Sequence, residues 1–239
     1  MQQEFFVKFE GSFQGQVYSG SSPPRAFFPN SKSFRAFSEF ISKTILERMA
    51  NGSLSVWGKV GEMSPPLFVM PITIEPTKSR MCHDERFLNL WIKDLPLSLD
   101  LITELSRYVL NNSFRTSCED KSGYDYVRLS SNSRTYFGLQ WNGWYFVFYT
   151  LPFGWKASAY LYHSIGLIAT SYIRSHGIPC SQYIDDRYLV NFKSGEPLLL
   201  VLGLVFSVLK QPFISPATSS LILATLLALK SRPFSPRKR

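Results

Sequence analysis

Cysteine is scarce in this sequence of 239 residues, and the few cysteines stand far apart. Cys82, Cys118 and Cys180 are odd in number, and none belongs to a Cys-x-x-Cys pair. This pattern excludes a disulfide framework and a zinc knuckle, and it is typical of a reducing compartment. His83 follows Cys82, but no second Cys-His pair completes a set of four ligands, so we expect no structural zinc.

Long apolar runs are missing as well. Residues 198–209 and 221–229 are apolar, but both runs are shorter than the roughly 20 residues that a membrane-spanning helix needs. The N-terminal segment 1–10 alternates aromatic, polar and charged residues and lacks the apolar core of a signal peptide. We therefore expect an intracellular protein, cytoplasmic or nuclear, with no signal peptide and no transmembrane span.

Acidic residues are also few: 17 Asp and Glu stand against 26 Lys and Arg, which gives a formal net charge of +9. This balance favours a polyanionic partner, nucleic acid first and an anionic membrane surface second, although a basic protein need not have either. With 45% hydrophobic and 15% aromatic residues, the chain can bury a core and is not disordered. Its length allows one large domain or two subdomains.

Residue spacing predicts an α+β fold in which helices are mixed with antiparallel strands. A lead-in over 1–33 is rich in Ser, Gly and Pro, and we expect it to be loose. The elements expected after it are a helix with Ser33 as its N-cap that ends at Asn51-Gly52, an edge or fully buried strand at 67–70, a helix over 99–110, a strand over 114–119 and a helix over 158–174.

Asn142-Gly143 is the clearest local signal, because it separates two aromatic-rich runs, 136–141 and 144–148. A type I′ turn needs positive φ at both central residues, and Asn-Gly meets this need better than other pairs. The sequence therefore predicts a two-residue hairpin here.

Residues 183–186, Tyr-Ile-Asp-Asp, carry the most informative pattern. Apolar and aromatic residues on both sides predict a strand, a tight turn and a second strand, with the acids at the turn. Asp185 and Asp186 repel each other, and a folded protein tolerates such a pair when a cation lies beside it. An exposed Asp-Asp turn is also common, so this motif alone does not decide between a metal site and an ordinary surface turn.

Four segments together resemble a known family. They are 78–89 (Lys-Ser-Arg through Asn), 119–124 (Glu-Asp-Lys-Ser-Gly-Tyr), 151–158 (Leu-Pro-Phe-Gly-Trp-Lys-Ala-Ser) and 183–186. In this order they look like the fingers motifs and motifs A, B and C of a retrotransposon reverse transcriptase. The resemblance covers roughly 34–190 and is greatest to copies that carry a Lys-Ser-Gly-Tyr motif A.

The resemblance implies the fingers and palm of a right-hand polymerase, with an antiparallel palm sheet packed on helices. The fingers would comprise 34–94 and 127–157, and the palm would comprise 95–126 and 158–239. The likeness fades after Val190, so we expect a chain that is truncated before the thumb.

The resemblance also implies an activity, which is RNA-directed DNA polymerisation by nucleotidyl transfer with two Mg²⁺ ions, or with Mn²⁺. The partners would be an RNA or DNA template-primer and deoxynucleoside triphosphates, without a membrane. Asp185 and Asp186 match motif C, and Glu119 stands where motif A has its catalytic aspartate. These three carboxylates would hold the metals, and Asp120 is a further catalytic candidate whose side chain would point to the opposite face of a strand from Glu119.

Five further residues match the nucleotide-binding positions of the family. Lys78 and Arg80 match residues that grip the triphosphate. Tyr124 matches the aromatic residue that packs under the sugar, and Phe153 and Gly154 match the motif B turn. Taken alone, the basic pair also fits a solvated surface, and Tyr124 also fits a core.

Two other functions stay open. The extra methylene of Glu119 would displace a ligand oxygen, which is serious for the near-ideal geometry that Mg²⁺ requires. This departure favours a catalytically silent, nucleic-acid-binding remnant of a transposable element, or the product of a decaying element that has no function. The intact Tyr-Ile-Asp-Asp motif favours the enzyme.

Overall fold

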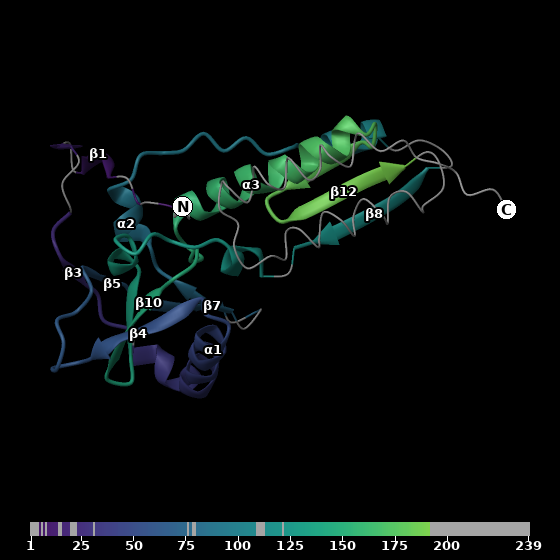
Figure 1. Cartoon of the computed structure of the whole chain (residues 1–239). Helices are drawn as coiled ribbons and strands as arrows, with labels where there is room; N and C mark the ends of the chain where they lie inside the picture. The colour runs from purple at the N-terminus through teal and green to yellow at the C-terminus, as the bar shows by residue number, and fades with distance from the viewer. Residues whose placement is uncertain are drawn as a thin grey trace. The chain divides into compact units, whose positions relative to one another are not determined.

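The computed structural model describes residues 5, 7, 9–13, 16–19, 23–30, 32–75, 77, 80–108, 113–120 and 122–191. Lys78 and the apolar segments 198–209 and 221–229 lie outside these residues. The described residues form two compact units (Figure 1). Within these residues, the α1 unit is drawn from Glu4–Leu97 and Ser122–Tyr160, and the β12 unit is drawn from Ser98–Lys121 and 161–191. No helix in the described part of the chain is both long and apolar enough to cross a membrane.

A five-stranded sheet forms the centre of the α1 unit. Its strands follow the order β3 (Ala26–Phe27), β5 (Phe68–Val69), β9 (Gly138–Trp141), β10 (Trp144–Phe148) and β4 (Leu54–Lys59). The first two pairings are parallel and the last two are antiparallel. The expected strand at 67–70 is thus an inner, buried strand rather than an edge strand. Phe68, Phe137 and Leu139 are completely buried at the centre of this unit.

The predicted hairpin at Asn142-Gly143 is confirmed. The two residues have φ values of 46° and 77°, as a type I′ turn requires. Trp141 and Trp144 pair directly across the turn, and the register continues without a shift along β9 and β10.

The prediction of a loose lead-in over 1–33 is wrong for the described residues. β1 (Glu10–Phe13) and β2 (Gln16–Ser19) form an antiparallel hairpin, and β3 adds an edge strand to the central sheet. Asn30 anchors this segment, because its amide donates to the Gln140 carbonyl at 2.7 Å and accepts from the Ile72 N–H at 2.8 Å. The Ser and Gly content concealed these strands, and the partner of β3, which is β5, lies far along the chain.

The first helix begins later than the sequence predicts. A 3₁₀ helix, η1 (Lys32–Phe37), leads into α1 (Ser38–Ala50), so Ser33 is not the N-cap of the α-helix. Ile41 and Ile45 form the buried face of α1. The helix ends at Asn51-Gly52, as predicted, because Gly52 takes a φ of 77°.

Smaller elements complete the α1 unit. β6 (Ile72–Glu75) and β7 (Arg80–His83) form a second antiparallel pair. The short helices are α2 (Arg86–Leu90), η3 (Gly123–Tyr126) and η4 (Arg134–Tyr136).

The β12 unit has a three-stranded antiparallel sheet in the order β11 (Cys180–Tyr183), β12 (Asp186–Asn191) and β8 (Phe114–Glu119). The part of α3 (Lys156–Ser175) that belongs to this unit runs along one face of the sheet (Figure 1). Apolar residues of α3 and of the sheet form a small core there: Ala169, Ile173, Cys180 and Leu189. The strand predicted over 114–119 and the helix predicted over 158–174 are therefore confirmed.

Of the helix predicted over 99–110, the structure describes residues up to 108, and these contain a 3₁₀ helix, η2 (Ile102–Tyr108). A 3₁₀ helix has three residues per turn. Apolar spacing of three or four residues therefore does not distinguish it from an α-helix in so short a segment.

Candidate active site

The turn between β11 and β12 carries the two adjacent aspartates. Ile184 and Asp185 form the turn itself, with Ile184 at a φ of 54°, and Asp186 is the first residue of β12. Tyr183 pairs with Asp186 across the turn. The predicted strand, tight turn and strand, with the acids at the turn, are confirmed.

Gln182 holds this turn from the buried side. Its side-chain amide donates to the Ile184 carbonyl and to the His163 carbonyl, each at 3.1 Å. Its amide oxygen accepts from the Thr170 hydroxyl at 2.5 Å. Gln182 is completely buried. These bonds therefore attach the turn that contains Asp185 to the helix α3.

β8 brings Glu119 and Asp120 to the same place. Glu119, the last residue of β8, pairs with Asp186 in the register of β8 and β12. The backbone N–H of Asp120 donates to the Asp185 carbonyl at 3.1 Å. Acids that are far apart in the sequence therefore lie on neighbouring strands.

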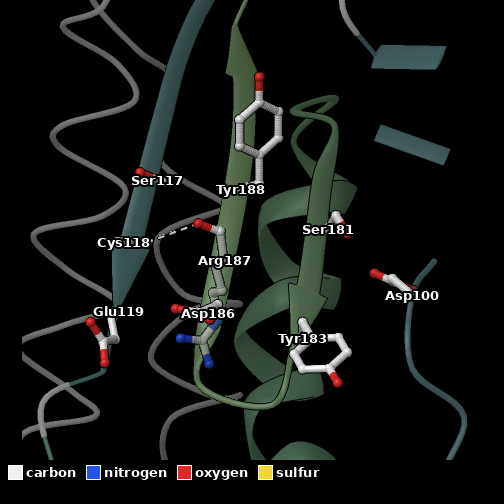
Figure 2. Close-up of a pocket in the computed structure, with 9 residues that line it drawn as sticks. All are labelled: Asp100, Ser117, Cys118, Glu119, Ser181, Tyr183, Asp186, Arg187 and Tyr188. Carbon is white, nitrogen blue, oxygen red and sulfur yellow. Dashed lines mark hydrogen bonds between the residues drawn. The ribbon is translucent and has the colours of Figure 1, made fainter. Parts of the chain in front are cut away.

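Glu119 and Asp120 make different contacts. Glu119 and Asp186 are exposed and line a common pocket of about 450 Å³, and Tyr183 and Tyr188 line it too (Figure 2). The Asp120 side chain is instead bonded to the buried Arg187. Of the two acids, Glu119 is the one that shares a pocket with Asp186.

Electrostatic repulsion concentrates at Asp185. Burial raises the pKa of its carboxyl group, and the negative charges of Asp186, Glu119 and Asp120 raise it further, against a hydrogen bond from its own backbone N–H that lowers it. A cation would relieve this repulsion.

The donor chemistry of this cluster fits Mg²⁺, since carboxylate oxygens are the hard ligands that this ion prefers. In the described part of the chain, however, no three His, Cys, Asp or Glu side chains are gathered closely enough to hold a metal ion. The backbone thus brings the acids together, but the side chains as placed do not form a closed ligand set.

The residues predicted to bind nucleotide belong to the α1 unit, apart from Lys78, which lies outside the described residues. Arg80 is exposed at the start of β7, and it lies opposite Glu75 in the register of β6 and β7. Tyr124 and Phe153 stack on each other, with ring centroids 4.9 Å apart and planes inclined by 29°. Phe153 is 46% exposed, so an aromatic face remains open to a ligand.

Gly154 is required by the packing of the turn at 153–154. Its φ is 101°, and a Cβ would lie 2.2 Å from the His83 carbonyl oxygen. Asn89 clamps the turn from both sides: its amide donates to the Gly154 carbonyl at 2.8 Å, and it accepts from the Lys156 N–H at 3.0 Å. Sequence reasoning gave Asn89 no role, although it closes the first of the four segments.

His83 is engaged within the α1 unit. Its Nδ1 lies 2.6 Å from Glu85 Oε1, and its Nε2 lies 3.1 Å from the Gly138 carbonyl oxygen. Burial raises the pKa of Glu85, against the opposing effect of the adjacent His83. Both ring nitrogens of His83 are therefore used in contacts that do not involve Cys82.

Sequence reasoning also missed the residues behind the acids. Arg187 is 2% exposed, and its guanidinium is bonded to Asp120, which also accepts from the Tyr162 hydroxyl. Burial and the neighbouring Asp120 raise the pKa of Tyr162. The available signal was an arginine directly after Asp-Asp, followed by the run Tyr188, Leu189 and Val190.

Comparison with solved structures identifies the class of fold. A foamy viral protease-reverse transcriptase in complex with dsDNA matches 89% of this chain at 17% identity and a TM-score of 0.63. A dRH form of the foamy viral protein, also with dsDNA, matches 89% of this chain at 18% identity and a TM-score of 0.61. The prototype foamy virus protease-reverse transcriptase CSH mutant matches 82% of this chain at 20% identity and a TM-score of 0.60. The chain has a reverse-transcriptase-like α+β fold.

The matched part is a fraction of each neighbour. This chain spans 41%, 34% and 25% of the three neighbouring chains. No protein-family model matches the sequence, and no curated protein matches it significantly.

Proposed function

We propose that this chain is the fingers and palm region of a retrotransposon reverse transcriptase, an RNA-directed DNA polymerase. The α1 unit would be the fingers and the β12 unit the palm. The reverse-transcriptase-like fold and the order of the four sequence motifs support this proposal.

The observation that carries the proposal is the pairing of Glu119 with Asp186 beside the turn at Asp185. We assign these three carboxylates as ligands of Mg²⁺, or of Mn²⁺. When bound, such ions activate the primer 3′-hydroxyl and stabilise the leaving pyrophosphate. The protein's part is to present carboxylate oxygens at the edge of a rigid sheet, where repulsion at Asp185 favours a cation.

The proposed substrates are deoxynucleoside triphosphates and an RNA or DNA template-primer. Lys78 and Arg80 would bind the triphosphate, and the stacked pair of Tyr124 and Phe153 would contact the sugar and base. The formal charge of +9 supports binding of the template-primer through its phosphates.

A second candidate function is that of a catalytically silent nucleic-acid-binding protein. It is favoured by the longer Glu119 at the motif A position and by the open arrangement of the acids in the described residues. Such a protein would keep the fold and the basic charge but would not extend a primer.

Primer extension on poly-A/oligo-dT with Mg²⁺ or Mn²⁺ tests the proposal. The unaltered chain should incorporate nucleotide, and Asp185→Asn, which preserves side-chain size, should abolish incorporation. Binding of the template-primer by a chain that does not extend it with either ion would establish the silent protein instead. Incorporation that survives Asp185→Asn would rule out the assigned site.

A further inference from the structure

The β12 unit holds a buried charge network that the proposed chemistry does not use. Arg187 follows Asp186 in β12, and its side chain is 1% exposed. Its Nη1 donates to Asp120 Oδ2 at 2.8 Å, and the Tyr162 hydroxyl on α3 donates to the same oxygen at 2.7 Å. One carboxylate oxygen therefore joins the end of β8, the start of β12 and α3.

We propose that Arg187 and Asp120 are positioning residues, which fix the spacing between the two backbone segments that carry the site acids. This inference rests on the proposed function. Asp120 directly follows Glu119, and Arg187 directly follows Asp186. Each member of the ion pair is thus one peptide bond away from an acid of the candidate site.

A backbone bond runs between the same two segments. The Asp120 N–H donates to the Asp185 carbonyl at 3.1 Å. Arg187 is also among the residues that line the pocket shared by Glu119 and Asp186, and its guanidinium is bonded to the Asp120 carboxylate. The ion pair therefore holds these two segments directly beside that pocket.

Stability alone is a weak reason for this ion pair. Removing two charges from water costs about as much as their attraction returns, and apolar side chains of similar volume often pack equally well. Arg187 is also incompletely satisfied, because its Nε and Nη2 have no hydrogen-bond partner in the described structure. A hydrogen-bonded ion pair differs from apolar packing in that it sets a direction and a distance between its partners.

Gly166 on α3 leaves the space that the network needs. A Cβ at this position would lie 2.8 Å from Arg187 Nη2 and 2.2 Å from Gln182 Nε2. The same glycine thus accommodates Arg187 and the glutamine that donates to the Ile184 carbonyl. At this point α3 therefore packs against Gln182 of β11 and Arg187 of β12, the two strands on either side of the turn at Asp185.

The test is a titration of the full chain with Mn²⁺. Electron paramagnetic resonance measures the free ion, so the dissociation constant is obtained without catalysis. Arg187→Met removes a positive charge, which by Coulomb attraction alone would tighten cation binding. A positioning role predicts the opposite sign, a roughly 10–100-fold weaker Kd, as is usual when support behind metal ligands is lost. Arg107→Met removes the same charge from an exposed ion pair with Glu104 and should leave the Kd unchanged.

A double variant separates positioning from folding. Arg187→Met leaves Asp120 buried without its counter-ion, so its melting temperature should fall. Asp120→Ala combined with Arg187→Met removes both charges and should recover most of the melting temperature while the Mn²⁺ affinity stays low. Recovery of both quantities would show that the pair is only structural, and would overturn the inference.

Hydrogen exchange distinguishes failure of this inference from failure of the proposed function. If the unaltered chain binds no Mn²⁺, the assigned metal site is wrong, but Arg187→Met should still accelerate exchange over 114–120 and 180–191 relative to Arg107→Met. Unchanged exchange in these segments would overturn the positioning role, as would tighter Mn²⁺ binding by Arg187→Met. If the chain extends primers, kcat should fall in Arg187→Met with little change in KM for nucleotide.

Discussion

Replacing Gly154 with alanine should destabilise the α1 unit by two separate effects. Gly154 has a φ of 101°, and an L residue in the left-handed region costs about 1–2 kcal/mol. The new Cβ would also lie 2.2 Å from the His83 carbonyl oxygen, a backbone atom that no side-chain rotation can move away. Relieving such overpacking costs about 1–3 kcal/mol. The expected loss of unfolding free energy is therefore about 2–5 kcal/mol.

Gly61→Ala is the matched control within the same unit. Gly61 has a φ of 87°, and no atom lies within 4 Å of an added Cβ, so this variant carries the backbone cost without the contact. Urea denaturation of both variants measures the difference, which should be about 1–3 kcal/mol. Equal losses in the two variants would refute the argument that the His83 carbonyl is what excludes a side chain at Gly154.

The site acids and the basic charge give three further expected outcomes. Glu119→Asp should raise Mg²⁺-dependent primer extension, since it removes the extra methylene; no gain would count against Glu119 as a ligand. Nucleic-acid binding in gel-shift titrations should weaken steeply with salt and vary little with sequence, because phosphate contacts release counterions; salt-independent binding would contradict this. Because the folded-state pKa of Asp185 is raised, its ionised form opposes folding above that pKa. Asp185→Asn should therefore raise the melting temperature at pH 7 in EDTA, with a gain that shrinks as the pH falls through the pKa, and an unchanged melting temperature would disprove this.

Local chemistry made part of the fold predictable. The turn at Asn142-Gly143 needs only its own two residues to set the φ values, and the sequence supplies them. The turn at Ile184-Asp185 was predictable because apolar runs flank it on both sides. The alternation of a strand also indicated that Glu119 and Asp120 would face different surroundings.

Long-range pairing and packing were not predictable in the same way. The pairing of β3 with β5 joins residues about 40 positions apart through strands of only two residues each, which is too short for any periodicity to show. The bond between Arg187 and Asp120 spans 67 positions and depends on the register of two strands. The sequence indicated Gly154 only through its match to the motif B turn, and the structure adds the His83 carbonyl as a reason for glycine there.

The charges around Asp185 bear on the choice between an enzyme and a silent remnant. Asp120 is paired with Arg187, but in the described structure no lysine, arginine or histidine forms a salt bridge with Asp185, Asp186 or Glu119. Burial and the neighbouring negative charges raise the pKa of Asp185, so its ionised form is unfavourable in the folded state. A ligand that binds only the folded state offsets such a cost by an amount that grows with the logarithm of its concentration over its Kd. An ionised Asp185 that is unfavourable without a cation, beside a pocket lined by Glu119 and Asp186, is what the proposed metal-binding role requires, whereas phosphate contacts need positive charge rather than a carboxylate cluster.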